Sequence, residues 1–360
     1  MKFDKTKKNI PVINAYRAIG IILVMFAHYT YNIVGFFSPN DFISGLHNVG
    51  YVAVMIFFSV SGFVIPWWLY HAKYRIKDYF RFVGRRLTRI EPPFLAALAL
   101  AIIYTFVRTM SPHFNGVDTI PSVKQTVLQL GYLVPFTEPE IPWIRPAYWT
   151  LAIEAQFYLL MGLLYPLITH AKLIWRTLAY TIILGGCIYL MTYTSGIFPW
   201  PYLFRYFPIL LSGILLCLVL VEKINVKEYL IVSAVNIAVI IYFLKGSDLL
   251  SILFLPPMIL FFRNYTTKFL NFIGNMSYSI YLMHSITGTA VLNYLSHVVE
   301  NPYLKVLALL FGIVFTLFCS WVFYKLVEKP SHRLSLRIAI NEFEFAGRKK
   351  KVKEAEKIKN

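Results

Sequence analysis

An arginine and a histidine share one face of the first long apolar stretch. Arg17 and His28 are eleven residues apart. Eleven helical steps of about 100° amount to about 1100°, or three turns plus about 20°, so both side chains point to the same side of a helix. The helical rise places His28 about 16 Å beyond Arg17 along the axis. Ionisable groups inside a bilayer are rare and usually face an interior cavity, so the pair indicates a functional site. The plainer alternative is a neutral histidine hydrogen-bonded between helices.

A carboxylate, Glu154, lies one to two turns into another apolar stretch. Its surroundings are the run Tyr148-Trp149-Thr150-Leu151-Ala152-Ile153-Glu154-Ala155-Gln156-Phe157-Tyr158. A carboxylate in that position needs a partner or a proton. Two interpretations stay open. The group could orient a histidine or bind a polar substrate, or it could form a structural ion pair with Arg145, Arg205 or Arg108.

Two arginines three residues apart, Arg86 and Arg89, precede Pro92-Pro93. Guanidinium groups at this spacing can bind a phosphate or pyrophosphate bidentately. The surrounding segment 71–91 has apolar residues at helical spacing and basic residues on its other faces, which predicts an amphipathic helix at the inner membrane surface. Binding of anionic lipid would also explain most of these charges.

Two further runs combine small, hydroxyl and aromatic residues. Phe57-Phe58-Ser59-Val60-Ser61-Gly62-Phe63 would permit close helix packing. The run 277–284 places Ser277, Tyr281 and His284 on one helical face. Hydroxyl-rich faces more often join helices than carry out catalysis, so we interpret the serines as structural and treat His284 as a candidate site residue.

The composition requires elements that cross a membrane. Of the 360 residues, 58% are hydrophobic and 14% are charged, against about 25% charged in soluble domains. An aromatic content of 17% excludes a disordered chain, and the long apolar runs do not alternate as barrel strands do. We predict an all-α polytopic membrane protein with about ten transmembrane helices, near 12–37, 48–70, 92–111, 147–168, 174–194, 202–221, 229–245, 248–263, 272–296 and 303–326.

The basic residues predict the topology. Of the 35 Lys and Arg residues, 29 fall in one set of alternate connections, which places the N- and C-termini in the cytoplasm. This asymmetry accounts for the net charge of +18 without a nucleic-acid partner. We divide the chain into a basic N-terminus (1–11), a transmembrane domain (12–328) and a basic cytoplasmic tail (329–360). The three cysteines show no disulfide or metal-binding spacing, and we predict no metal.

Read in order, these runs resemble the membrane-bound acyltransferase 3 family, of the glycan O-acetyltransferase type. The resemblance covers about 10–335 and includes Glu328-Lys329-Pro330 and the segments quoted above. Asn14 and Met55 stand where the family commonly has acidic residues, which places more weight on Glu154. The soluble hydrolase-like domain of some longer members is not expected here.

The resemblance implies transfer of an acyl group, most often acetyl, from cytoplasmic acyl-coenzyme A to a hydroxyl of a cell-envelope glycan such as O-antigen or exopolysaccharide. It also implies a multi-pass protein of the bacterial inner membrane, with membrane lipids and a glycan or lipid-linked sugar as partners. A sugar hydroxyl needs a nearby base, and a histidine with an ordinary pKa of about 6.5 is largely neutral at cellular pH. His28 is therefore the expected general base or, alternatively, a covalent acyl acceptor.

The other site residues receive roles on the same basis. Arg17 would stabilise charge at the thioester oxygen and Glu154 would orient His28 or bind acceptor hydroxyls. Arg86 and Arg89 would bind coenzyme A phosphates. We assign substrate binding to Trp149, Tyr281 and His284. The outer loop 112–146, with Glu138 and Glu140, is a candidate for acceptor selection.

Two other classes of protein also fit the pattern. A glycolipid or polysaccharide transporter could use buried His and Glu residues as a proton relay, and it would move an unmodified substrate without acyl-coenzyme A. A non-catalytic scaffold would tolerate changes at Arg17 and His28.

Overall fold

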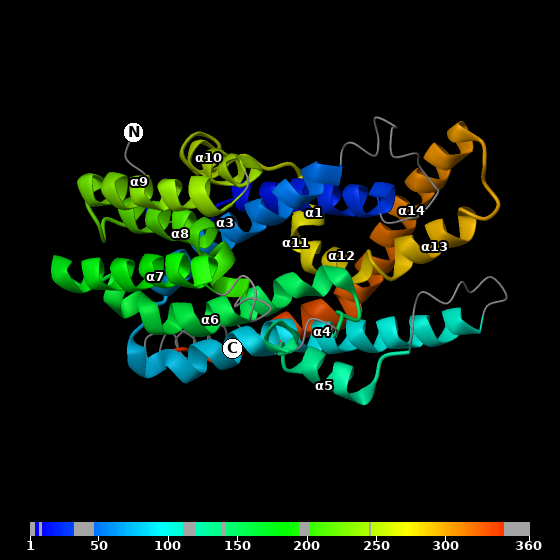
Figure 1. Ribbon diagram of the computed structural model, residues 1–360, viewed down its shortest axis with the longest axis horizontal. Coiled ribbons are helices and arrows are strands. Elements are labelled where there is room, and N and C mark those ends of the chain that lie inside the picture. Colours follow the sequence, from blue (N-terminus) through cyan, green and yellow to red (C-terminus); the bar gives the residue numbers. More distant parts are fainter. Residues whose placement is uncertain are drawn as a thin grey trace, which may run out of the picture.

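Figure 1 shows the computed structural model, which describes residues 4–6, 9–31, 47–110, 120–137, 141–193, 202–244 and 246–341. Every regular element among these residues is a helix. The α-helices are α1 (Val12–Tyr31), α3 (His47–His71), α4 (Tyr79–Thr109), α5 (Val123–Leu130), α6 (Trp149–Ile168), α7 (Leu173–Tyr193), α8 (Tyr202–Leu220), α9 (Val226–Phe243), α10 (Gly246–Phe261), α11 (Lys268–Asn275), α12 (Ser277–Met283), α13 (Thr287–Leu295), α14 (Pro302–Phe323) and α15 (Lys329–Ser335). The turns η1 (Ile76–Asp78), η2 (Val134–Phe136) and η3 (Pro146–Tyr148) are 3-10 helices, and η4 (Tyr324–Glu328) is a π-helix.

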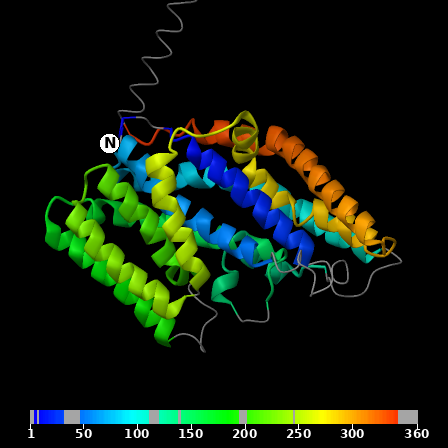
Figure 2. The same ribbon diagram turned by 90° about the horizontal axis from the view of Figure 1, so that it is seen from above.

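Eight segments of the described chain are helices long and apolar enough to cross a bilayer. They match the first seven predicted segments and the tenth, which confirms an all-helical, multi-pass membrane protein. The eighth predicted segment is the shorter helix α10. Helix α1 lies in the middle of the molecule, with α7 to α9 on one side and α13 and α14 on the other (Figure 2).

The prediction of one continuous ninth helix over 272–296 was wrong, because three short helices, α11 to α13, occupy this region. The cause of the first break is a side chain from η4. In an uninterrupted helix the amide of Ser279 would bond to a carbonyl four residues earlier. Here it donates instead to Glu328 Oε2 at 3.0 Å, and the Ser279 hydroxyl donates to the same oxygen.

The predicted boundary between a surface helix over 71–91 and a membrane helix from residue 92 was also wrong. Helix α4 runs through Pro92-Pro93 as one helix of 31 residues. Proline has no N–H, so the carbonyls four residues before each proline lose their helical partners. The Ser331 hydroxyl of α15 donates to both, at 2.7 Å to Thr88 O and 3.1 Å to Arg89 O. The Ser331 hydroxyl therefore replaces the two helical hydrogen bonds that the prolines cannot donate.

Close helix packing holds α1, α3 and α8 together. A Cβ atom at Gly62 would lie 2.0 Å from Leu210 O, and one at Gly213 would lie 2.0 Å from Ser59 O. The backbones of α3 and α8 therefore meet where each has a glycine, which confirms the close packing predicted for the run 57–63. Asn14 joins α1 to α11, because its side-chain amide donates to Asn271 Oδ1 at 2.6 Å and to Asn275 Oδ1 at 3.2 Å.

The segment after Glu328 packs against the membrane domain as far as it is described. Helix α15 contacts α4, and Ile340 is fully buried in the core. The Asn341 side-chain amide donates to Ala72 O. The polybasic end at 348–351 lies outside the described residues. So do Glu138, Glu140 and residues 112–119 of the acceptor loop predicted over 112–146.

Candidate active site

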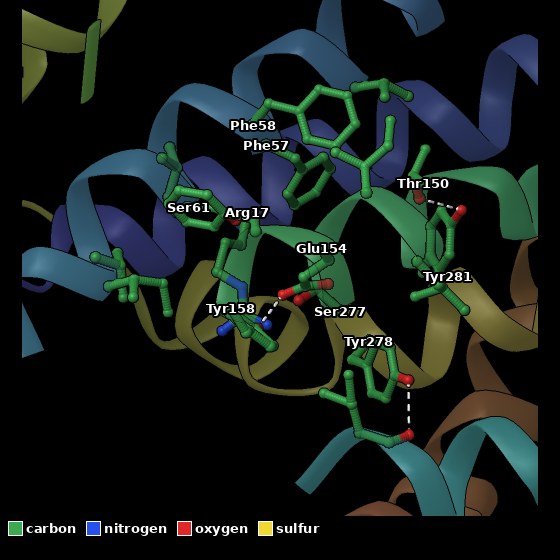
Figure 3. A pocket seen from close by; sticks show the side chains of 18 of the residues that line it. Arg17, Phe57, Phe58, Ser61, Thr150, Glu154, Tyr158, Ser277, Tyr278 and Tyr281 are labelled. Atoms are coloured by element: carbon green, nitrogen blue, oxygen red, sulfur yellow. Dashed lines mark hydrogen bonds between the residues drawn. The ribbon is translucent and has the colours of Figure 1, made fainter. Parts of the chain in front are cut away.

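Residues of α1, α3, α4, α6, α8 and α12 line a cavity of about 170 Å³. Figure 3 shows Arg17, Glu154 and Tyr158 close together inside it. Arg86 and Arg89 from α4 also line the cavity. Tyr281 of α12 is a further lining residue, so the structure brings five of the predicted site residues into one space from four separate helices.

The three arginines of this cavity donate no side-chain hydrogen bond to any other residue that the structure describes, which distinguishes them from an ordinary buried guanidinium. Arg86 is 7% exposed, and its buried Nε has no acceptor. Its guanidinium carbon instead lies 4.6 Å from the centre of the Trp68 ring and 5.5 Å from that of Tyr158. Cation–π contacts of this kind hold a guanidinium in place without using its N–H groups. The donors of Arg86 are therefore available to an anionic ligand.

Glu154 partly balances this positive charge. Its carboxylate accepts a hydrogen bond from the Tyr158 hydroxyl one turn later on α6, and it lies within electrostatic reach of Arg17 and Arg86. No described ion pair links it to Arg145, which donates to Thr105 Oγ1 at 3.3 Å and lies over the Tyr104 ring. With three arginines and one carboxylate lining it, the cavity favours a ligand that carries negative charge.

His28 and His284 form a pair just beyond the cavity. Their ring centres lie 4.9 Å apart with the planes at 61°. His28 Nδ1 lies 2.8 Å from Val24 O, and His284 Nδ1 lies 2.7 Å from Tyr281 O. A carbonyl can only accept, so Nδ1 carries the proton in both rings and Nε2 is the basic nitrogen of each. His284 is fully buried, and its Nε2 has no hydrogen-bond partner among the residues that the structure describes.

The remaining predicted site residues differ in whether they line the cavity. Tyr281 lines the cavity, whereas His28, His284 and Trp149 do not belong to its lining. Trp149 packs against Phe58 and Tyr206, with ring centres 6.0 and 5.2 Å apart. His28 nevertheless stays close to the cavity, because Val24, one turn earlier on α1, lines it.

Sequence reasoning gave no role to several residues that position the site. Glu328 is 7% exposed. It fixes the start of α12 through Ser279 and lies within electrostatic reach of Arg17. Ser331 holds α4 at the turn that carries Arg89. The signal for both was the run Glu328-Lys329-Pro330, in which an acidic residue directly follows a long apolar stretch.

The family model for the acyltransferase domain, acyltransferase 3, matches residues 10–325. This chain belongs to the acyltransferase 3 family. No curated protein and no solved structure matches it. The matched region contains every residue that lines the cavity, so the cavity of arginines and Glu154 lies within the acyltransferase domain itself.

Proposed function

We propose that this member of the acyltransferase 3 family transfers an acyl group, acetyl in the first instance, from cytoplasmic acyl-coenzyme A to a hydroxyl of a cell-envelope glycan. The bacterial inner membrane is the proposed location. The observation that carries the proposal is one cavity in which three arginines have no hydrogen-bond acceptor among the described residues, with a pair of histidines at its border. An anionic donor and a hydroxyl acceptor are the substrates that such a site can use together.

The arginines of α4 bind the phosphates of the acyl donor in this proposal. Coenzyme A carries a pyrophosphate and a further phosphate, and guanidinium groups bind such oxygens in pairs. Arg86 fits this ligand because the Trp68 and Tyr158 rings hold its guanidinium in place, while its Nε has no acceptor among the described residues. Arg17 is the candidate for the thioester oxygen, on which negative charge develops during attack.

The histidine pair provides the base. The acceptor hydroxyl gives its proton to His28 Nε2 as its oxygen forms a bond to the thioester carbonyl carbon. The carbon–sulfur bond then breaks, and the thiolate of coenzyme A takes the proton from His28. The products are an O-acyl ester and the free thiol, and His28 returns to its neutral form.

Mass spectrometry of the host's surface glycans tests the proposal. A strain that lacks the protein is complemented with the wild-type chain or with His28→Ala. An acetyl-sized increment with the wild type alone supports the proposal, and the modified sugar identifies the acceptor. An increment restored by well-expressed His28→Ala contradicts the role of His28. No increment from the wild type, combined with changed glycan export, would support a transporter instead.

A further inference from the structure

A hydrogen bond between two hydroxyl groups joins α6 and α12 at one end of the cavity. The Tyr281 hydroxyl of α12 and Thr150 Oγ1 of α6 lie 2.5 Å apart, and both residues line the cavity. In Figure 3 this pair lies away from Arg17 and Ser61, with Glu154 between them. The cavity therefore has an arginine end and a tyrosine end.

The histidine pair lies next to the tyrosine end. The Tyr281 ring centre is 5.8 Å from that of His284, which is itself in contact with His28. Tyr281 thus lines the cavity and also packs against the histidine pair, whose rings do not line the cavity. A group that enters from the arginine end meets the Tyr281 ring where it approaches the proposed base.

Part of the cavity wall is apolar. Val24, Val54, Phe57 and Leu151 line the cavity together with Tyr281. Such a lining suits a hydrocarbon chain better than a sugar, because a sugar hydroxyl buried there would lack hydrogen-bond partners. If the phosphates of coenzyme A bind at the arginines, the acyl group at the other end of the donor points toward Tyr281.

We propose that Tyr281, held in place by Thr150 at one end of the cavity, limits the length of the acyl group that the protein transfers. This inference rests on the proposed acyl transfer. The donor carbonyl has to reach the hydroxyl activated by His28, and each further methylene of the acyl chain has to share space with the fixed Tyr281 ring. Apolar pockets discriminate by about 10- to 200-fold per methylene when the space is confined.

The test compares donors of increasing length. Membranes of the host that carry each variant receive acetyl-, propionyl- or butyryl-coenzyme A, and mass spectrometry measures the acyl increments on the glycan. The wild type should transfer acetyl best. Tyr281→Ala, which removes the ring, should raise the butyryl-to-acetyl ratio by about 10-fold or more. Tyr281→Phe and Thr150→Val, which remove only the hydrogen bond, should each raise it less and by equal amounts.

A double variant and a neighbouring tyrosine give the controls. Tyr281→Phe combined with Thr150→Val should act no more strongly than either change alone, because both remove the same bond. Tyr278 lies one turn earlier on α12 and also lines the cavity, but its hydroxyl donates to Ile90 O at 2.9 Å. Tyr278→Phe should leave the butyryl-to-acetyl ratio unchanged.

The outcomes separate the inference from the function on which it rests. If the wild type transfers acetyl and the ratio does not rise in Tyr281→Ala, the limit on acyl length is overturned and acyl transfer stands. A rise in Tyr281→Ala without one in Tyr281→Phe and Thr150→Val overturns the part of Thr150. An equal rise in Tyr278→Phe also overturns the assignment to Tyr281. If the wild type transfers no acyl group from any donor, the proposed function fails and the inference fails with it.

Discussion

Arg86 and Arg176 are about equally buried, at 7% and 8% exposed, but their surroundings are opposite. Arg176 Nε lies 2.8 Å from Glu228 Oε1 and one terminal nitrogen lies 2.6 Å from Glu228 Oε2, while the other donates to His170 O and Ala171 O. Arg86 is surrounded by aromatic rings, and its Nε has no acceptor in the part of the chain that the structure describes. A buried guanidinium with satisfied donors stabilises the fold, whereas one without acceptors in a cavity is suited to a ligand.

The histidines show the same contrast. His71 has both ring nitrogens within hydrogen-bond distance of backbone carbonyls, Trp67 O at 2.9 Å and Lys5 O at 3.1 Å. His284 uses Nδ1, and within the described part of the chain its Nε2 has no partner. Four predictions test whether this difference separates structural residues from functional ones.

The largest effect is expected at His28. His28→Ala should lower the rate of acyl transfer by about 10²- to 10⁴-fold, the usual contribution of a general base. Thermal unfolding of the purified protein in detergent should change little. His71→Gln is the matched control and should retain transfer, because its hydrogen bonds are to backbone carbonyls. Equal losses of acyl transfer in His28→Ala and His71→Gln would contradict the distinction between functional and structural histidines.

The next effect is on stability. Arg176→Met should lower the free energy of unfolding by about 3–5 kcal/mol, because it leaves the Glu228 carboxylate buried without its partner. The donor KM of the protein that stays folded should not change. Thermal unfolding monitored by circular dichroism measures the first quantity. Arg176→Met combined with Glu228→Gln should recover part of the loss, and no recovery would contradict the ion-pair explanation.

A smaller effect is expected at the donor end. Arg86→Glu and Arg89→Glu should each raise the donor KM about 10- to 100-fold and lower kcat less, since each removes charged hydrogen bonds to phosphate. Arg81→Glu on the exposed side of α4 is the control. Steady-state rates over a range of acetyl-coenzyme A concentrations provide the measurement. An unchanged KM in Arg86→Glu would exclude donor binding there.

The smallest effect is expected where α15 supports α4. Ser331→Ala removes the hydrogen bonds to Thr88 O and Arg89 O and should cost about 0.5–1.5 kcal/mol of unfolding free energy. The donor KM should rise a few-fold, because Arg89 lies on the affected turn. Ser335→Ala is the matched control, since its hydroxyl donates to His332 O within α15. A larger KM change in Ser335→Ala would show that α15 acts by another route.

Much of the fold could be predicted because membrane helices are encoded locally. A run of about twenty apolar residues must satisfy its own backbone hydrogen bonds within a bilayer, and a helix does so without help from distant residues. The first seven predicted segments and the tenth therefore correspond to long helices. The predictions were wrong where a distant side chain replaces a local bond, as Glu328 does at Ser279 and Ser331 does beside Pro92-Pro93.

The sequence by itself determined the kinds of site residue and their helical faces. Arg17 and His28 had to share a face of α1, and Arg86 and Arg89 had to lie one turn apart, because helix geometry depends only on spacing. Only the tertiary structure decided which of these residues meet. It placed Arg17, Arg86, Arg89 and Glu154 in one cavity, paired His28 with His284, and set Tyr281 between the two groups. These contacts depend on packing between helices that are distant in sequence, which no local sequence pattern encodes.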